Sequence, residues 1–136
     1  MKTKKNIMIK VNVNYPVGDF LVRLKNASIA RHKFLTVDKS KLVMAVSQTL
    51  KKARFLDDVK ENGDKFEVSL SYRKKEPVLM DVKLISKPGL RIYKSYEELE
   101  KRKSPTFAIV STSLGVMTSG EAIKKKVGGE VIAEVL

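Results

Sequence analysis

Two short polar segments near the C-terminus carry the residue types best suited to contacting another molecule. The run Ser111-Thr112-Ser113 places three hydroxyl side chains in a row, and Gly115 follows after one residue. The second segment joins the bare backbone of Gly128-Gly129 to the carboxylate of Glu130. Hydroxyls both donate and accept hydrogen bonds, and glycine permits close approach to the backbone. The pattern fits a binding surface, and it fits equally well two ordinary turns in which Ser and Gly serve the backbone conformation.

Residues able to catalyse a reaction or to bind a metal are sparse. The chain has no cysteine and a single histidine, His32, which lies between Arg31 and Lys33. Disulfides, thiolate metal sites and cysteine nucleophiles are therefore excluded, and a histidine-based metal site lacks ligands. The adjacent carboxylates Asp57-Asp58 and Glu97-Glu98 diverge along the chain, so they do not form a catalytic acid pair. We predict that the chain is not an enzyme and that it uses no cofactor or metal.

The charge balance indicates an anionic partner. The 136 residues include 28 Lys and Arg against 15 Asp and Glu, a net charge of +13. Residues 1–60 carry 14 basic and 4 acidic residues, whereas residues 61–136 carry 14 basic and 11 acidic ones, so the excess lies mainly in the first half. Such an excess is self-repulsive unless an anion neutralises it. Nucleic acid, an anionic membrane surface or an acidic protein would serve, and the asymmetry disfavours lysines that only solubilise the surface.

The first 13 residues form a basic extension. Lys2, Lys4, Lys5 and Lys10 occur there without an acid, and polar residues interrupt the apolar ones. A signal peptide needs a continuous apolar stretch and a membrane-spanning helix needs about 20 apolar residues, so neither is expected in this chain. An edge strand and a frayed terminus are equally good interpretations of the extension.

Periodicity and turn signals predict an α+β fold of two small packed lobes. Residues 14–82 should form an α-β-α-β-β lobe, with helices that begin at Pro16 and after the cap Ser40. The strands expected in this lobe cover residues 34–37, 55–59 and 66–72, and residues 78–85 should continue their sheet. No flexible linker precedes residue 83, so the lobes should pack directly.

Residues 83–136 should form a mostly β lobe with short helices. We expect strands over residues 90–93, 107–110 and 130–135, with a polar turn over residues 111–115. Ser95 should cap a helix over residues 96–103, and Ser119 should cap one that runs to Lys126.

Three segments together resemble the bacterial form of small-subunit ribosomal protein eight. They are Ser86-Lys87-Pro88-Gly89-Leu90-Arg91-Ile92-Tyr93, then Val110-Ser111-Thr112-Ser113-Leu114-Gly115-Val116-Met117-Thr118, then Val127-Gly128-Gly129-Glu130-Val131. Pro16-Val17-Gly18-Asp19-Phe20-Leu21 is similar to the opening helix of that family, and the similarity runs from about Asn14 to the end. The resemblance implies two lobes and a cytoplasmic, ribosomal protein that binds the central domain of small-subunit rRNA and aids assembly.

The resemblance also implies which residues contact RNA and which partners exist. The two polar segments would be the recognition surface, and basic groups would contact the RNA backbone. The implied RNA-binding residues are Ser111, Thr112, Ser113, Gly115, Gly128, Gly129, Glu130, Arg23, Lys25, Arg31, Lys33, Ser40, Lys41, Lys87 and Arg91. The implied partners are small-subunit rRNA, neighbouring ribosomal proteins and the mRNA of its own operon. The resemblance also implies that the protein is a monomer outside the ribosome and does not bind a membrane.

The chain departs from the family pattern at residues 114 and 15, among other positions. Leu114 stands where the family usually has Lys, which puts one phosphate contact in doubt, and Tyr15 replaces the usual Asp before Pro16. Three rival functions remain at this point: a repressor acting mainly on mRNA, a nucleic-acid-processing enzyme and a membrane-surface protein that uses the basic extension. The enzyme would need a carboxylate cluster or a second titratable base, and we find neither.

Overall fold

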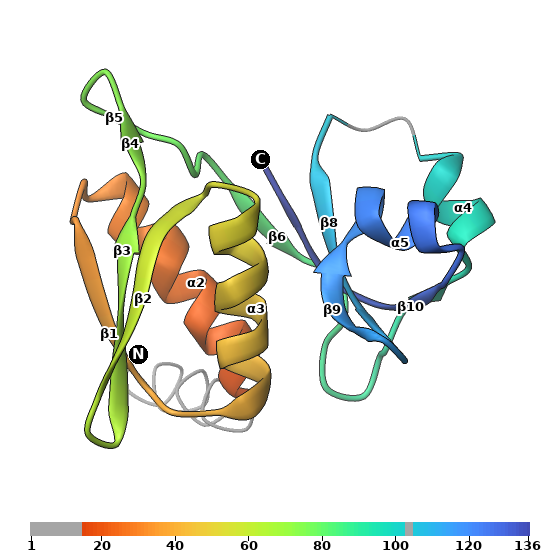
Figure 1. Cartoon of the computed structure of the whole chain (residues 1–136), viewed down its shortest axis with the longest axis horizontal. Coiled ribbons are helices and arrows are strands. Elements are labelled where there is room, and N and C mark those ends of the chain that lie inside the picture. Colours follow the sequence, from red (N-terminus) through yellow and green to blue (C-terminus); the bar gives the residue numbers. More distant parts are fainter. Residues whose placement is uncertain (1–14, 103–104) are drawn as a thin grey trace, which may run out of the picture.

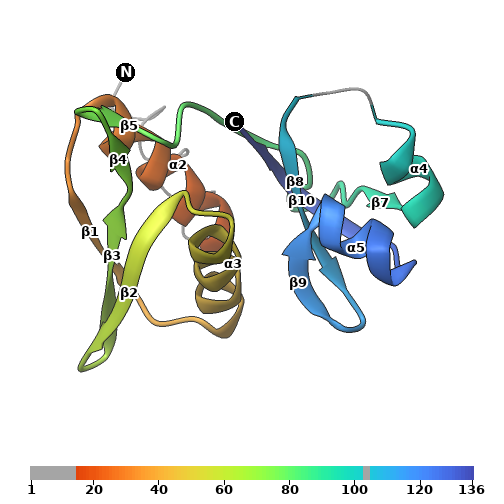
Figure 2. The same cartoon turned by 45° about the horizontal axis from the view of Figure 1, so that its top comes forward.

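The computed structural model describes residues 15–102 and 105–136, which fold into two lobes lying side by side (Figure 1). The basic extension over residues 1–13 lies outside the described residues. The two views in Figure 1 and Figure 2 agree that the first lobe is a sheet with two helices and the second lobe a sheet with two short helices. The expected α+β class is therefore confirmed.

The first lobe has the predicted α-β-α-β-β order. Its elements are α2 (Pro16–Ile29), β1 (Phe34–Asp38), α3 (Lys41–Lys52), β2 (Leu56–Asn62) and β3 (Lys65–Leu70). The sheet order is β1-β3-β2, with antiparallel pairing throughout, and both helices lie on one side of it (Figure 1). Phe66, Val68 and Leu70 of β3 are buried and alternate with less buried residues, so the sheet buries one face against the helices.

The second lobe is built around one long strand. Its elements are β6 (Val82–Leu84), β7 (Tyr93–Lys94), α4 (Tyr96–Glu100), β8 (Phe107–Thr112), β9 (Gly115–Thr118), α5 (Ser119–Lys125) and β10 (Gly129–Val135). The sheet order is β6-β10-β8-β9, and β7 also pairs with β10. A small hairpin of β4 (Tyr72–Arg73) and β5 (Glu76–Pro77) precedes this lobe.

The expectation that residues 78–85 continue the first sheet is wrong. β6 instead pairs with β10 in the second sheet, because the chain crosses between the lobes before it. Leu79 is buried and its carbonyl accepts a hydrogen bond from the Ser28 hydroxyl of α2. The next backbone N–H groups, of Met80 and Asp81, donate to the carbonyl of Leu136 at 2.7 and 3.0 Å. The division of the chain between residues 82 and 83 stays a prediction, and β6 spans it.

Other boundaries in the second lobe also differ from expectation. The strand expected over residues 90–93 is shorter and later, because residues 87–90 close a turn. The helix capped by Ser95 ends at Glu100 rather than at residue 103. The cap of α5 is Thr118, whose hydroxyl accepts from Glu121 N at 3.3 Å, since the Ser119 hydroxyl accepts from Ala108 N instead.

One hydrophobic core joins the two lobes. Leu24 and Val46 of the first-lobe helices belong to the same buried cluster as Ile109 and Ile132 of the second sheet. Residues on the other face of the second sheet pack under α4 and α5, which lie away from the first lobe (Figure 1 and Figure 2). The Thr49 hydroxyl of α3 also donates to the Val116 carbonyl of β9 at 3.1 Å. The second sheet is therefore held against the first lobe by its own buried side chains.

The crossing segment should contribute strongly to stability. Leu79 is 1% exposed in the shared core, whereas the adjacent Met80 is 70% exposed. Leu79→Ala should lower the free energy of unfolding by about 2–5 kcal/mol, because it removes packing and leaves a cavity. Met80→Ala, the matched control, should change it by less than about 0.5 kcal/mol. Urea unfolding measures both, and equal effects would contradict the role of the crossing segment.

Candidate nucleic-acid interface

The two polar segments meet at one end of the second sheet. In the β8–β10 pair Thr112 lies opposite Gly129 and Ser111 lies opposite Glu130, and in the β8–β9 pair Thr112 lies opposite Gly115. We call the set formed by Ser111, Thr112, Ser113, Gly115, Gly128, Gly129 and Glu130 the polar edge. Strand pairing therefore brings together two segments that are more than ten residues apart in the sequence.

The expected polar turn over residues 111–115 is shorter than predicted. Ser111 and Thr112 belong to β8 and Gly115 to β9, so the turn itself consists of Ser113 and Leu114. The Thr112 hydroxyl closes this turn, since it donates to the Gly115 carbonyl at 2.8 Å and accepts from Leu114 N at 3.1 Å. Within the described part of the chain, the hydroxyls of Ser111 and Ser113 have no hydrogen-bond partner. They remain open to an external partner, whereas the Thr112 hydroxyl serves the turn.

The glycines of the polar edge are required for different structural reasons. A Cβ on Gly129 would lie 2.1 Å from the Ser111 carbonyl oxygen, and one on Gly128 would lie 2.4 Å from the Lys94 carbonyl oxygen. These two glycines allow neighbouring strands to approach closely. Their role in the backbone therefore explains why residues 128 and 129 are glycine. Gly115 has φ +120° with nothing within 4 Å of its Cβ position, which leaves its backbone accessible.

Glu130 is restrained by Arg91 at the polar edge. The Arg91 guanidinium contacts the Glu130 carboxylate at 3.2 Å, and the Glu130 side chain is only 21% exposed. Arg91 also lies over the ring of Tyr15, 5.1 Å from its centroid. The structure thus places Arg91 in contacts within the protein, although it was predicted to contact RNA.

Tyr93 and Lys94 extend the polar edge and were not predicted as site residues. They form β7, in which Tyr93 pairs with Glu130 and Lys94 pairs with Gly129. Tyr93 is 66% exposed and therefore presents an aromatic face to solvent. Tyr93 ends one of the segments that carry the family resemblance, but only the pairing of β7 with β10, which is not visible in the sequence, brings it here.

Most of the predicted basic residues in the first lobe are paired with carboxylates. Lys25 contacts Asp81 at 2.9 Å, Arg31 contacts Glu76 at 3.1 Å and Lys33 contacts Asp57 at 3.3 Å. A fourth, Arg23, donates to the Thr36 carbonyl at 3.1 Å. The side chains of the three ion pairs are substantially exposed, so the pairs contribute little to stability and can exchange partners.

The pKa shifts of the paired carboxylates agree with this geometry. A hydrogen bond from the Ser71 hydroxyl, with a smaller one from Lys33, lowers the pKa of Asp57. The hydrogen bond from Lys25 is the main cause that lowers the pKa of Asp81. These carboxylates are therefore charged at neutral pH, and a phosphate that approached Lys25 or Lys33 would have to compete with them.

The remaining three predicted RNA-binding residues, two lysines and one serine, do not contact a carboxylate of the residues that the structure describes. Lys41 and Lys87 are exposed, and among residues 15–102 and 105–136 no carboxylate lies within ion-pair distance of either. Ser40 caps α3, because its hydroxyl accepts a hydrogen bond from Val43 N at 3.5 Å. Lys41 and Lys87 are thus cations whose charge no neighbouring side chain in this part of the chain neutralises.

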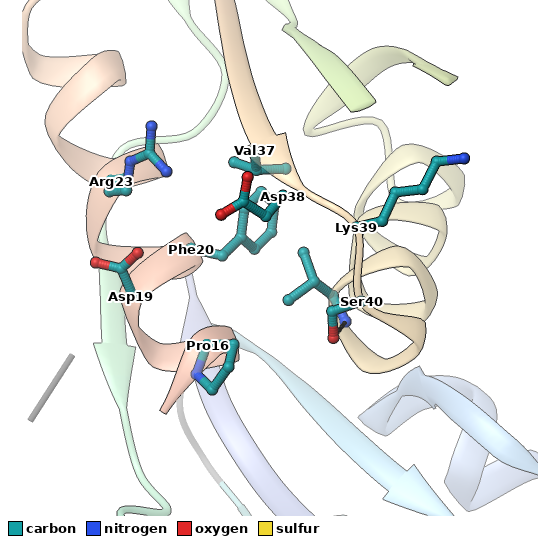
Figure 3. Close-up of a pocket in the computed structure, with 9 residues that line it drawn as sticks. Pro16, Asp19, Phe20, Arg23, Val37, Asp38, Lys39 and Ser40 are labelled. Carbon is teal, nitrogen blue, oxygen red and sulfur yellow. Dashed lines mark hydrogen bonds between the residues drawn. The ribbon is translucent and has the colours of Figure 1, made fainter. Parts of the chain in front are cut away.

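A hollow of about 270 Å³ lies between the start of α2 and the start of α3. Figure 3 shows Asp19 and Arg23 of α2 facing Asp38 and Ser40 across it. Asp38 also accepts a hydrogen bond from Lys65, which is the main cause that lowers its pKa. The hollow therefore brings together two predicted RNA-binding residues, Arg23 and Ser40, in surroundings of mixed charge.

The described residues offer neither a metal centre nor a membrane-spanning helix. Across residues 15–102 and 105–136, no three His, Asp or Glu side chains are grouped closely enough to hold a metal ion. No helix in this described part is long and apolar enough to cross a membrane.

Comparison with known proteins agrees with these features. A family model described as Ribosomal protein S8 matches residues 15–136. Small ribosomal subunit protein uS8 of Thermosynechococcus vestitus is 41% identical over 130 residues, covering 90% of this chain and 98% of that protein. The chain belongs to the ribosomal protein S8 family. The proteins of the same name from Synechococcus elongatus and Coxiella burnetii are 38% and 37% identical, and this chain covers 98% and 96% of them.

Family membership confirms several expectations from the sequence. The family consists of structural, non-enzymatic components of the ribosome, so a ribosomal and therefore cytoplasmic location is confirmed, and so is the expectation that the chain is not an enzyme. The enzyme is thereby removed as a rival function. The roles of individual residues in binding RNA stay predictions.

The close approach of β8 and β10 can be tested at Gly129. Gly129→Ala should lower the free energy of unfolding by about 1–3 kcal/mol, because its Cβ cannot fit beside the Ser111 carbonyl without moving a strand. Gly120→Ala is the matched control, since the nearest atom to its Cβ position is 4.0 Å away. It should leave stability within about 1 kcal/mol of wild type. Thermal unfolding of both variants decides, and an unaffected Gly129→Ala variant would contradict this pairing of β8 with β10.

Proposed function

We propose that this chain binds, as a monomer, a helical element in the central domain of small-subunit rRNA and aids assembly of the subunit. The observation that carries the proposal is the polar edge, where open hydroxyls, an accessible glycine backbone, a restrained carboxylate and an exposed aromatic ring converge. A polyanion is the partner that a net charge of +13 favours. The other ribosomal proteins that lie beside this RNA would be its protein neighbours.

The two lobes would divide the work of binding. Cations such as Lys41 and Arg23 in the first lobe would contact phosphates, release counterions and set the orientation on the RNA. The polar edge would read the shape and the exposed base and ribose edges of an irregular helix. The open Ser113 hydroxyl can donate to and accept from 2′-hydroxyls, Gly115 lets an RNA strand approach closely, and Tyr93 offers a face on which an unpaired base can stack.

The ion pairs of the first lobe affect how phosphate contacts form. Lys25, Arg31 and Lys33 each hold a carboxylate in the free protein. A phosphate must displace that carboxylate or share the cation with it. Lys41 and Lys87 bear no such partner in the described part of the chain, so we infer that they contribute more to RNA affinity per residue than the paired cations.

RNA binding should depend steeply on salt. With about six phosphate contacts, affinity should fall roughly a thousandfold between 50 and 200 mM salt. Lys41→Ala should reduce the slope of log affinity against log salt by about one at most, for any RNA. Lys39→Ala is the matched control, because Lys39 already contacts Glu61 at 2.7 Å, and it should reduce the slope less. Filter binding at several salt concentrations measures the slopes, and a flat response of the wild-type protein would reject the proposal.

The polar edge should control selectivity rather than overall attraction. Ser113→Ala removes an open hydroxyl that makes no hydrogen bond within the described protein, so the fold should be unaffected. Its affinity for the cognate rRNA helix should fall by about 1–3 kcal/mol if the hydroxyl pairs with a buried RNA group. Its affinity for a scrambled hairpin of equal length should stay the same. Equal losses on both RNAs would contradict the division of work between the lobes.

We propose a second role, repression of its own operon mRNA, on the strength of the family resemblance. An mRNA that carried a copy of the rRNA helix would present the same contours to the polar edge. The two RNAs should therefore compete for one surface. Competition binding with the leader of the operon mRNA tests this role, and simultaneous binding of both RNAs would exclude a shared site.

A further inference from the structure

Tyr15 reaches from the first lobe into the second. It immediately precedes α2, and its residue is 8% exposed. Its hydroxyl makes no cap for α2 but donates to the carbonyl of Ser86 at 3.0 Å. Its ring lies beneath the guanidinium of Arg91, with 5.1 Å between the guanidinium carbon and the ring centroid. This side chain thus connects the start of the first lobe to the segment that leads to the polar edge.

The point where the Tyr15 hydroxyl binds is itself fixed. Ser86 is fully buried, and its hydroxyl donates to the Val131 carbonyl at 2.7 Å and accepts from Ile92 N at 3.0 Å. These bonds attach residues 86–92 to β10. Burial is the main cause that raises the pKa of the Tyr15 phenol, so the hydroxyl remains a donor at neutral pH.

Gly18 provides the space for the ring. A Cβ at Gly18 would lie 2.4 Å from Cδ2 and 2.7 Å from Cε2 of Tyr15. Gly18 lies in the first turn of α2, and glycine is a weaker helix former than alanine. The pair Tyr15 and Gly18 is therefore spatially matched: the ring occupies the volume that a side chain at residue 18 would fill.

We propose that Tyr15 is a positioning residue for RNA selectivity, acting through Arg91 on Glu130. The ring holds the guanidinium, and the guanidinium holds the Glu130 carboxylate at 3.2 Å on the polar edge. An unrestrained carboxylate would repel phosphates and would lose rotational freedom on binding. A restrained, partly neutralised carboxylate can accept hydrogen bonds from RNA donors without those costs. This inference rests on the proposed function.

The test compares affinities for the cognate rRNA helix and for a scrambled hairpin at one salt concentration. Tyr15→Leu should lower the ratio of the two affinities about fivefold, the factor that a cation–π contact of about 1 kcal/mol gives. Tyr15→Phe keeps the ring and should retain most of the ratio. Gly18→Ala should lower the ratio like Tyr15→Leu, because its Cβ displaces the ring. Thermal unfolding of each variant, with the affinities measured well below its midpoint, separates a loss of selectivity from a loss of stability.

Tyr72→Leu is a matched control. Tyr72 also lies under a cation, with Lys33 Nζ 5.7 Å from its ring centroid, and also donates to a backbone carbonyl, that of His32 at 2.8 Å. It lies away from the polar edge, so its loss should leave the affinity ratio unchanged. A drop in the ratio for Tyr72→Leu equal to that for Tyr15→Leu would overturn the proposal.

A double-mutant cycle shows whether Tyr15 acts through Glu130. Glu130→Gln combined with Tyr15→Leu should reduce the ratio no more than Glu130→Gln alone, since both changes affect one carboxylate. Additive losses would overturn the proposal, as would an unchanged ratio in Tyr15→Leu and Gly18→Ala. If Tyr15→Leu does not fold, Gly18→Ala takes its place in the cycle. A wild-type protein that binds both RNAs equally would reject the proposed function itself, whereas normal wild-type selectivity with unaffected variants rejects only this inference.

Discussion

The pairing of β10 with three other strands is the interaction on which the rest of the molecule depends. Its C-terminal half pairs with β6 and β8 and buries Ile132 and Val135 in the core shared with the first lobe. Its N-terminal end pairs with β7 and β8 and forms much of the polar edge. The strand whose side chains pack the second lobe against the first therefore also fixes, by its backbone pairing, the geometry of the surface that would read RNA. A binding surface built from paired strand ends is more rigid than one built from a free loop.

Under the proposed function, electrostatic attraction to RNA and selectivity among RNAs would have separate physical origins. The excess of positive charge acts over a Debye length and does not distinguish one RNA from another. Exposed ion pairs such as Arg31–Glu76 add little to the stability of the fold, but each pair restricts the conformations of its long basic side chain. The polar edge carries short side chains and backbone groups, which act only at contact distance. Under the proposed function, orientation by the first lobe would therefore precede discrimination by the second lobe.

Local signals predicted the elements well, and long-range pairing explains what they missed. Pro16, Ser40 and Ser95 marked helix starts because capping is a local effect, and alternation marked β3 because one face of a sheet is buried. Whether β6 joins the first or the second sheet depends on its pairing with Ala133 to Val135 of β10, about fifty residues away, so no local pattern decides it. The same applies to the site: the hydroxyl and glycine types were informative, whereas the position of Tyr93 and the pairing of Arg91 needed the fold.

The replacement of an acidic cap by Tyr15 illustrates why a local rule fails where a tertiary contact competes. The Asp that the family usually has before Pro16 could cap the helix start, and Tyr15 cannot, so the substitution removes an N-cap acid. In the structure Pro16 needs no hydrogen bond at the first helical position, so part of the cap is dispensable. The side chain at residue 15 is then free to serve another contact, and the nearby Gly18 leaves room for a ring that reaches the second lobe. A change that weakens one helix terminus can in this way strengthen the connection between lobes.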